Sequence, residues 1–335
     1  MKDTPTRIKI IRKGIEREQP ETFAWGDLLF ITDASCTEYD WLIVYDEFPK
    51  GSTGTVLHGS ERLACPRERT ILITVEPPNI KIYSTPYVRQ FGYVLTTHPA
   101  RLMKHPGHRI GKGCLRWFYE KDWAAMDAQT DFPKPETVSV VCSSKQQKRT
   151  RHFDRYSLVR YLADHMPELQ WFGHGVKPIR SKNEALDDFK YHIAIENYIA
   201  DGHWTEKPAD VLLAAALPFY AGDPKITEVL PPGSIIPIPL DNPPEALRII
   251  REAIAAGEYE KRLPAILEAR RLILHKYNMW AQVAEIIARH KDAPGSAPGF
   301  ILKGRHRLRR NPLNAIREGW DILRYKAGKL FGVFQ

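Results

Sequence analysis

Short apolar runs bounded by glycine, proline or charged residues recur in the first part of the chain. Three of them, at 40–48, 69–78 and 91–99, have the length and the β-branched or aromatic content that predict buried parallel strands. A polar stretch containing proline, residues 127–136, then interrupts the pattern, and a new apolar run starts at Val138. We therefore predict a domain boundary at this stretch.

The second half of the chain alternates strand and helix patterns. Strands are expected at 137–142, 169–175, 190–197, 218–222 and 234–238, and helices at 153–166, at 208–217 and in the long stretch 243–290. Repeated strand-helix units predict a parallel, doubly wound sheet, which makes the fold class α/β. In such sheets ligands bind beyond the carboxyl ends of the strands.

Composition agrees with a soluble globular protein of two domains. The chain has 335 residues, of which 43% are hydrophobic and 27% charged. Its four cysteines are scattered and form no metal-binding pattern, which favours reduced thiols in the cytoplasm. Because the N-terminal residues include neither a signal-peptide core nor a long apolar span, we expect a cytoplasmic protein.

Most of the net charge of +9 lies at the end of the chain. Residues 300–335 contain nine lysines and arginines but only two acidic residues, and the rest of the chain is nearly neutral. No zinc-finger spacing, aromatic RNA-binding motif or basic region leading into heptads is present, so nucleic acid is not an expected partner.

The same tail has an apolar stripe at helical spacing. Its members recur at steps of three and four residues: Leu313, Ile316, Trp320, Leu323, Ala327 and Leu330. Basic residues flank the stripe, a pattern typical of a helix on a membrane surface, where a lipid-linked glycan acceptor would be held. On that interpretation the protein is peripheral on the inner membrane. A helix docked on the body of the protein is the other interpretation.

A polar cluster follows the strand expected at 190–197. Glu196 and Asn197 fall at its carboxyl end, and the next helix opens with Thr205, Glu206 and Lys207 ahead of a proline that suits a first helical turn. Helix N-termini favour anions, and a lysine there adds a full charge for a diphosphate. Alternatively, Thr205 or Glu206 only caps the helix and Lys207 is solvated.

The stretch from Phe189 to Pro224, FKYHIAIENYIADGHWTEKPADVLLAAALPFYAGDP, resembles the donor-site signature of the α1,3-fucosyltransferases, glycosyltransferase family 10. The resemblance implies a GT-B architecture, in which two Rossmann-like domains face each other across a cleft. It also implies GDP-fucose as the donor and inversion at the anomeric carbon. By position, Asn197, Glu206 and Lys207 would contact the ribose, the fucose and the diphosphate.

The resemblance extends to three further residues. Arg155, in RYSLVRYL, corresponds to the arginine that opens the first helix of the donor domain, although Arg151 lies nearby. His203 replaces a tyrosine common in the family, and it either contacts the donor or fills the space as a polar wall. Glu76, in ITVEPPNIKIY, corresponds to the proposed general base, which an acceptor hydroxyl needs in order to lose its proton. A helix cap or an exposed strand end is the alternative for Glu76.

These observations predict residues 1–130 as an acceptor-binding domain, 137–295 as a donor-binding domain and 300–335 as a basic amphipathic tail. The expected activity is inverting transfer of L-fucose from GDP-fucose to a surface glycan, α1,3 to a GlcNAc-type sugar. We expect a bacterial-type enzyme, because eukaryotic relatives carry an N-terminal membrane anchor that this sequence does not show. The alternatives are a transferase for another GDP-sugar and a noncatalytic protein that binds glycan or nucleic acid.

The sequence also bears on how the leaving diphosphate is stabilised. Asp-x-Asp, the usual motif by which a transferase holds a divalent ion on a diphosphate, does not occur in the chain. Arg155, Lys207 and the helix N-terminus could carry the charge directly. We therefore expect chemistry without metal or other cofactor.

Overall fold

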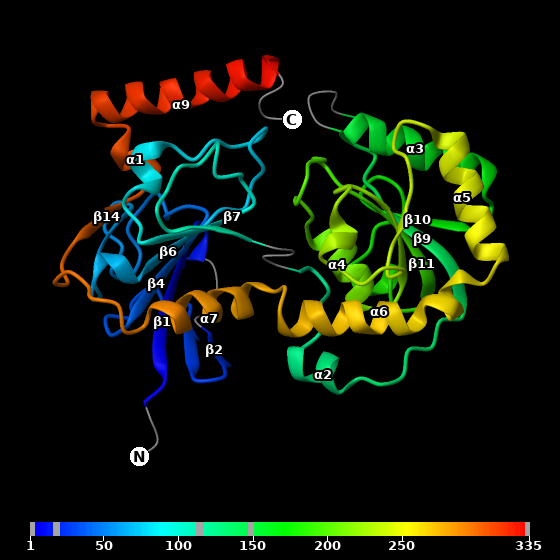
Figure 1. Cartoon of the computed structure of the whole chain (residues 1–335), viewed down its shortest axis with the longest axis horizontal. Helices are drawn as coiled ribbons and strands as arrows, with labels where there is room; N and C mark the ends of the chain where they lie inside the picture. Colours follow the sequence, from blue (N-terminus) through cyan, green and yellow to red (C-terminus); the bar gives the residue numbers. More distant parts are fainter. Residues whose placement is uncertain (1–3, 16–20, 112–116, 147–150, 332–335) are drawn as a thin grey trace. The chain divides into compact units, whose positions relative to one another are not determined.

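The computed structural model describes residues 4–15, 21–111, 117–146 and 151–331 (Figure 1). The chain divides into two compact units. Met1–Gly111 and Val283–Gln335 form the first unit, and Lys112–Gln282 form the second. Each unit is built on a parallel sheet, so the predicted α/β class with two Rossmann-like units is confirmed.

The first unit contains a seven-stranded sheet. Its strands are β1 (Thr6–Arg12), β2 (Thr22–Trp25), β3 (Leu28–Ile31), β4 (Trp41–Tyr45), β6 (Thr70–Ile73), β7 (Tyr93–Thr96) and β8 (His108–Ile110), in the order β2-β3-β1-β4-β6-β7-β8. All neighbours are parallel except the edge pair of β2 and β3. Ile8 and Ile11 of the central strand β1 are completely buried, as expected for a strand covered on both faces.

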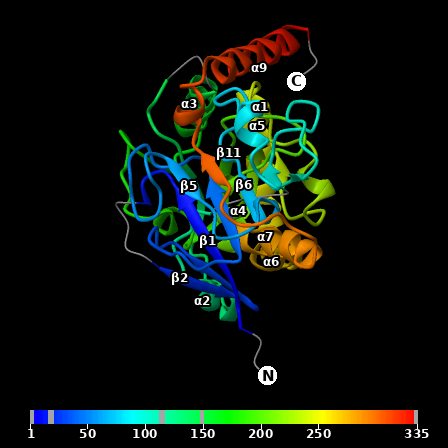
Figure 2. The ribbon, with the colours of Figure 1, turned by 90° about the vertical axis from the view of Figure 1, so that its left-hand side faces the viewer.

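The tail belongs to the first unit. After residues 291–300, which have no regular structure, β14 (Ile301–Lys303) pairs antiparallel with β5 (Ser60–Arg62). Two helices follow, α8 (Arg305–Leu308) and α9 (Pro312–Leu330). Figures 1 and 2 show α9 running beside α1 (Thr85–Val88), and residues of the two helices are in contact.

The second unit has a five-stranded, all-parallel sheet. Its strands are β9 (Glu136–Val141), β10 (Leu169–Phe172), β11 (Phe189–Ile195), β12 (Leu217–Ala221) and β13 (Ile236–Pro237), in the order β10-β9-β11-β12-β13. Its helices are α2 (Trp123–Ala128), α3 (His152–His165), α4 (Glu206–Leu213), α5 (Pro243–Ala255) and α6 (Glu258–His275), and α7 (Met279–His290) spans the division between the units.

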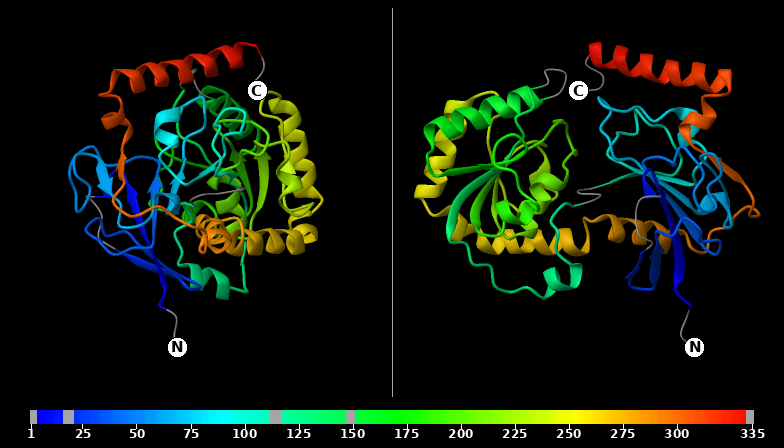
Figure 3. Two further views of the ribbon diagram at one scale, coloured as in Figure 1. Left: turned by 60° about the vertical axis from the view of Figure 1, so that its left-hand side comes forward. Right: turned by 180° about the vertical axis from the view of Figure 1, so that it is seen from behind.

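The order of the strands places the helices on both faces of this sheet. The chain moves one way from β9 to β10 and the opposite way from β11 to β12. Right-handed crossovers therefore put α3 and α4 on opposite faces. Helix α3 packs with α5, and α4 packs with α6 (Figure 3). The point of reversal, between β9 and β11, is where open α/β sheets bind ligands.

The predicted strands are confirmed, but several strands of the first unit were not predicted, among them β1 and the apolar β3. The strands expected at 40–48, 69–78 and 91–99 are present as β4, β6 and β7, and those expected in the second half are β9 to β13. Strand β1 is not predicted from the sequence, because charged residues alternate with short apolar runs there. Lys9 is nevertheless completely buried, and its Nζ lies 3.0 Å from Glu61 Oε1.

The domain boundary predicted at residues 127–136 is wrong, because α2 belongs to the second unit. Trp123 Nε1 donates to the carbonyl of Leu274 at 3.0 Å, and Arg270 Nη2 donates to the carbonyl of Met126. These bonds fasten α2 to α6, so the division falls between Gly111 and Lys112 instead.

The predicted end of the second domain, residue 295, is also wrong. The chain rejoins the first unit at Val283, within α7. His290 stacks on Tyr93 of β7 with ring centroids 4.6 Å apart, and Arg69 Nη2 donates to the carbonyl of Lys291 at 3.1 Å. The helical periodicity of 243–290 does not indicate that α7 leaves the second unit and packs with the first.

Candidate functional site

The carboxyl edge of the second sheet brings together most of the predicted site residues. Strand β11 ends at Ile195, so Glu196 and Asn197 lie at this edge. Helix α4 begins there as well, after the loop that follows β11, with Thr205 as its N-cap. Arg155 lies near the start of α3, in the crossover from β9 to β10. Parallel strand-helix units start their helices at this edge, which is why residues distant in sequence converge.

Glu196 fixes the start of α4. Its side chain is 1% exposed, and its Oε1 accepts hydrogen bonds from the backbone N–H and the hydroxyl of Thr205, each at 2.9 Å. The hydroxyl of Tyr220 lies 3.4 Å from the same oxygen. The Glu196 carboxylate therefore sets the distance between the end of β11 and the first turn of α4.

Lys207 lies between two carboxylates. Its Nζ is 2.9 Å from Glu206 Oε1 and 3.4 Å from Glu196 Oε2, and its side chain is only 16% exposed. Burial alone would lower the pKa of Lys207, but Glu196 and Glu206 raise it above its usual value. Burial would likewise raise the pKa of Glu206, yet Lys207 and Lys182 lower it to about 2. Lys207 and Glu206 are thus both charged near neutral pH.

Arg155 supplies a second cation at the edge. Its Nη1 donates to Asn197 Oδ1, and its Nε is buried without a hydrogen-bond partner among the residues that the structure describes. The charge of Arg155 also acts on Lys207, whose pKa it lowers against the larger effect of the carboxylates. This edge of the sheet therefore carries two cations that repel each other, and one of them has a buried donor without a partner among the described residues.

The loop after β12 closes the site from the other side. A Cβ added to Gly222 would lie 2.1 Å from the Tyr220 hydroxyl and 2.7 Å from Glu196 Cγ, so only glycine fits. Asp223 is 2% exposed and accepts from the backbone N–H of Gly202 and of Lys225, each at 2.9 Å. These three residues lie in the stretch that resembles the donor-site signature, but they are not among the predicted site residues. Tyr220 lies within β12, and Gly222 and Asp223 follow that buried strand directly, which was the signal available.

The structure decides the open alternative for Thr205 and Lys207, and it shows the surroundings of His203. Thr205 caps α4, since its side chain accepts from the backbone N–H of Lys207, but Lys207 is not solvated. His203 is 5% exposed and packs edge-to-face on Tyr198, with ring centroids 5.2 Å apart.

Glu76 lies in the first unit, just past the end of β6. The hydroxyl of Tyr83 accepts from the backbone N–H of Val75 at 3.0 Å and of Glu76 at 3.3 Å, and His98 Nε2 donates to the Glu76 carbonyl at 2.9 Å. The backbone of Glu76 is therefore held from two sides. Within the described ranges, its carboxylate accepts no hydrogen bond, so it is neither a helix cap nor part of an ion pair.

Other polar residues lie at the same edge of the first sheet. Asp46 follows β4 and accepts from Lys81 Nζ at 2.8 Å and from the Tyr83 hydroxyl. Burial lowers the pKa of His98 to about 4, so its ring is neutral at pH 7. Sequence reasoning did not find this cluster, because its members come from three separate strand ends. The Asp46 carboxylate is therefore already paired, whereas that of Glu76 has no hydrogen-bond partner in the described ranges.

Among the described residues, no group of three or more histidine, cysteine, aspartate or glutamate side chains could hold a metal ion. In the same part of the chain, none of the helices has both the length and the apolar character that crossing a membrane requires.

Comparison with known proteins finds similarity in structure only. No protein-family model matches the chain, and no curated protein is significantly similar to it in sequence. Several solved glycosyltransferase structures are similar. A crystal structure of an α1,3-fucosyltransferase with GDP has 15% identity and a TM-score of 0.46, and the match covers 84% of this chain and 94% of that one.

Two further structures come from other glycosyltransferases. Sucrose-phosphate synthase from Thermosynechococcus elongatus has 10% identity and a TM-score of 0.44, with 85% of this chain and 88% of that one covered. A glycosyltransferase from Rickettsia africae has 9% identity and a TM-score of 0.44, with 87% and 100% covered.

Proposed function

We propose that this protein is an inverting glycosyltransferase that takes L-fucose from GDP-fucose. The observation that carries the proposal is the pair of cations, Arg155 and Lys207, at the carboxyl edge of the second sheet. Arg155 has a buried Nε with no partner among the described residues, and Lys207 lies at the N-terminus of α4. The negative charge of a nucleoside diphosphate matches two cations beside a helix N-terminus.

The residues around the cations suit the rest of a GDP-sugar. In this proposal the Asn197 side chain, which Arg155 orients, contacts the ribose. Glu206 stays ionised, because Lys207 and Lys182 lower its pKa to about 2. Its carboxylate then accepts from the hydroxyls of the sugar. Glu196 remains a positioning residue, since both of its carboxylate oxygens already accept from the Thr205 hydroxyl.

For the transfer itself we assign the general base to Glu76. Its carboxylate takes the proton of the acceptor hydroxyl as the acceptor oxygen bonds to the anomeric carbon from the face opposite the diphosphate. The bond between that carbon and the diphosphate oxygen breaks, and GDP leaves with the electron pair. Attack from the opposite face inverts the anomeric configuration. The acceptor we propose is a GlcNAc-type sugar of a surface glycan, fucosylated in α1,3 linkage.

The charge that develops on the leaving diphosphate is stabilised by Arg155, Lys207 and the N-terminal turn of α4. These groups are fixed by Asn197, Glu196 and Glu206 before the donor binds, and preorganised donors stabilise charge most effectively. We therefore propose that transfer needs no divalent ion. Activity in the presence of excess EDTA should equal activity without it, and a loss restored by added Mg²⁺ or Mn²⁺ would contradict this part.

The deciding experiment measures the donor directly. Calorimetry of the full chain should give a saturable signal with GDP, and release of GDP should be faster from GDP-fucose than from GDP-mannose. A panel of acceptor sugars then identifies the acceptor. The proposal is overturned if the protein does not bind GDP at any concentration. If only GDP-mannose is turned over, the diphosphate site stands and the assigned donor sugar changes from fucose to mannose.

A further inference from the structure

Helix α9 presents its apolar side to the outside. Its large hydrophobic residues are between 57% and 81% exposed: Leu313, Ile316, Trp320, Leu323 and Leu330. From Leu313 to Leu330 this apolar stripe is about 26 Å long. A surface helix of a globular protein normally turns such a stripe toward the core.

Polar residues hold α9 on the first unit instead. Glu318 is 5% exposed and lies 2.5 Å from both Arg305 Nη2 and Arg309 Nη2. Asp321 accepts from the backbone N–H of Thr85 at 2.7 Å and from its hydroxyl at 3.0 Å. The helix is therefore docked, as one interpretation of the sequence expected, but through its polar face. Docking of this kind holds the apolar stripe outward in one orientation.

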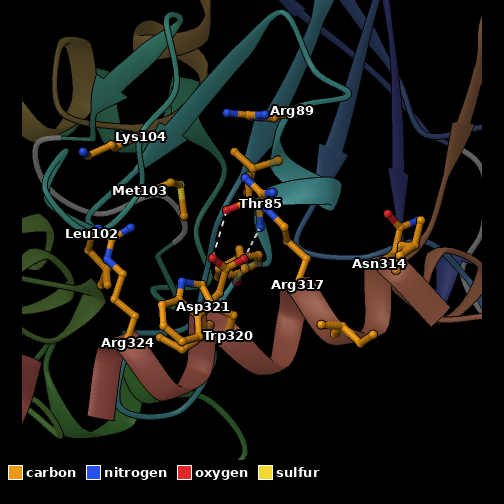
Figure 4. A pocket seen from close by; sticks show the side chains of 15 residues that line it. Thr85, Arg89, Leu102, Met103, Lys104, Asn314, Arg317, Trp320, Asp321 and Arg324 are labelled. Carbon is orange, nitrogen blue, oxygen red and sulfur yellow. Dashed lines mark hydrogen bonds between the residues drawn. The ribbon is translucent and has the colours of Figure 1, made fainter. Parts of the chain in front are cut away.

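A cavity of about 800 Å³ lies beside the stripe, between α9 and the segment from Ile82 to Lys104 (Figure 4). One wall is apolar and includes Leu102, Met103 and Trp320. Figure 4 shows Arg317 and Arg324 projecting from α9 toward the opposite segment, which carries Arg89 and Lys104.

The lining of this α9 cavity is strongly positive. It contains four cations, Arg89, Lys104, Arg317 and Arg324, and a single carboxylate, Asp321, which is engaged with Thr85. In the described part of the chain, Arg89, Lys104 and Arg317 form no ion pair, and Arg324 donates only to the carbonyl of Arg101. The cavity thus combines unpaired positive charge with an apolar wall that continues into the stripe.

We propose that α9 lies on an anionic lipid bilayer and that the α9 cavity takes the phosphate group of one lipid. An apolar stripe flanked by lysine and arginine, on a helix held parallel to a surface, fits the boundary between headgroups and acyl chains. The cations beside it attract anionic headgroups. Nucleic acid would meet the same charge, but it offers nothing to cover the large apolar residues of the stripe. This proposal is independent of the GDP site.

Vesicle flotation tests the proposal with the full chain. The protein should float with vesicles of phosphatidylcholine and phosphatidylglycerol, and bind at least about tenfold more weakly to phosphatidylcholine alone. Arg317→Glu and Arg89→Glu should each lower binding by about tenfold. Trp320→Ser should also lower it. These side chains are exposed and unpaired, so circular dichroism and the Tm should be unchanged.

Lys50→Glu is the matched control. Lys50 is an exposed lysine of the first unit that does not line the cavity, and the change in net charge is the same. Binding should stay within about twofold of the unchanged protein at physiological salt. An equal loss in Lys50→Glu and Arg317→Glu would overturn the cavity assignment, because charge anywhere would then suffice.

Three further results would overturn the proposal. If inorganic phosphate or glycerol phosphate binds as tightly as the vesicles and Trp320→Ser changes nothing, the cavity takes a soluble phosphate and not a lipid. If ultracentrifugation shows a dimer that Trp320→Ser converts to a monomer, a second copy of the chain covers the stripe. Absence of flotation with either vesicle would have the same consequence.

Discussion

Replacing Arg155 by methionine tests the donor site most directly, because it separates binding from folding. Met retains much of the aliphatic volume of Arg155 but removes its charge and its donors. The only side-chain hydrogen bond that the described structure gives Arg155 is to Asn197, which is itself partly exposed and can bond to water instead. We expect the free energy of unfolding to change by less than about 1 kcal/mol.

The effect on GDP binding should be much larger. A hydrogen bond between charged groups contributes about 1.5–3 kcal/mol. Arg155 and Lys207 also repel each other, since the charge of Arg155 acts to lower the pKa of Lys207. The variant removes this repulsion, which offsets part of the loss. A net loss of about 2 kcal/mol corresponds to a roughly 30-fold higher Kd for GDP.

Calorimetry with GDP, alongside thermal unfolding of the same samples, makes the measurement. Arg151→Met is the matched control, since Arg151 precedes the same helix, is exposed and lies 3.9 Å from Asp154. Its Kd for GDP should be unchanged. The reasoning is refuted if Arg155→Met binds GDP within about twofold of the unchanged protein, or if Arg151→Met loses as much.

Three further predictions concern the same machinery. Lys207→Met leaves Glu196 and Glu206 buried without their cation, so it should abolish measurable GDP binding and lower the free energy of unfolding by about 3–5 kcal/mol. Lys207→Arg should retain most of the stability. Equal unfolding midpoints for the two variants would contradict this prediction. Glu76→Gln should lower kcat by about 10²- to 10⁴-fold with the Kd for GDP unchanged, and an unaltered kcat would remove Glu76 from the role of base. Because the folded-state pKa of Glu206 is lowered to about 2, the stability it contributes is complete above about pH 5 and is lost as the pH falls toward 2. Denaturant titrations from pH 7 to acid pH should therefore show the stability difference between the unchanged protein and Glu206→Gln shrinking, and a constant difference would refute this assignment.

The order of the strands and helices in the second half follows from the sequence. Runs such as 193–195 and 217–221 are apolar, as expected of strands buried on both faces, and the helices between the strands have clear periodicity. The position of Glu196 and Asn197 at the carboxyl end of β11 was predictable for the same reason, and so was Thr205 at the start of α4.

Only the tertiary structure decided what these residues contact. Whether Lys207 is solvated or buried between two carboxylates depends on the loop that returns Thr205 to Glu196, and no local pattern specifies that return. Strand β1 could not be predicted from the sequence, because the buried charge of Lys9 is balanced by Glu61, which lies 52 residues away. Likewise, both interpretations of the tail were compatible with its periodicity, and the contacts of Glu318 and Asp321 determine which face of α9 is left outside.

The physical reason is the range of the interactions. Hydrophobic periodicity and helix capping act between neighbours along the chain, so the sequence alone determined the α/β class, the elements of the second sheet and the basic amphipathic character of α9. Ion pairs, cavities and domain boundaries depend on groups that meet only after the chain has folded. The pairing of Lys207 with Glu196, the transfer of residues 283–331 to the first unit and the outward apolar stripe of α9 were therefore decided by the tertiary structure.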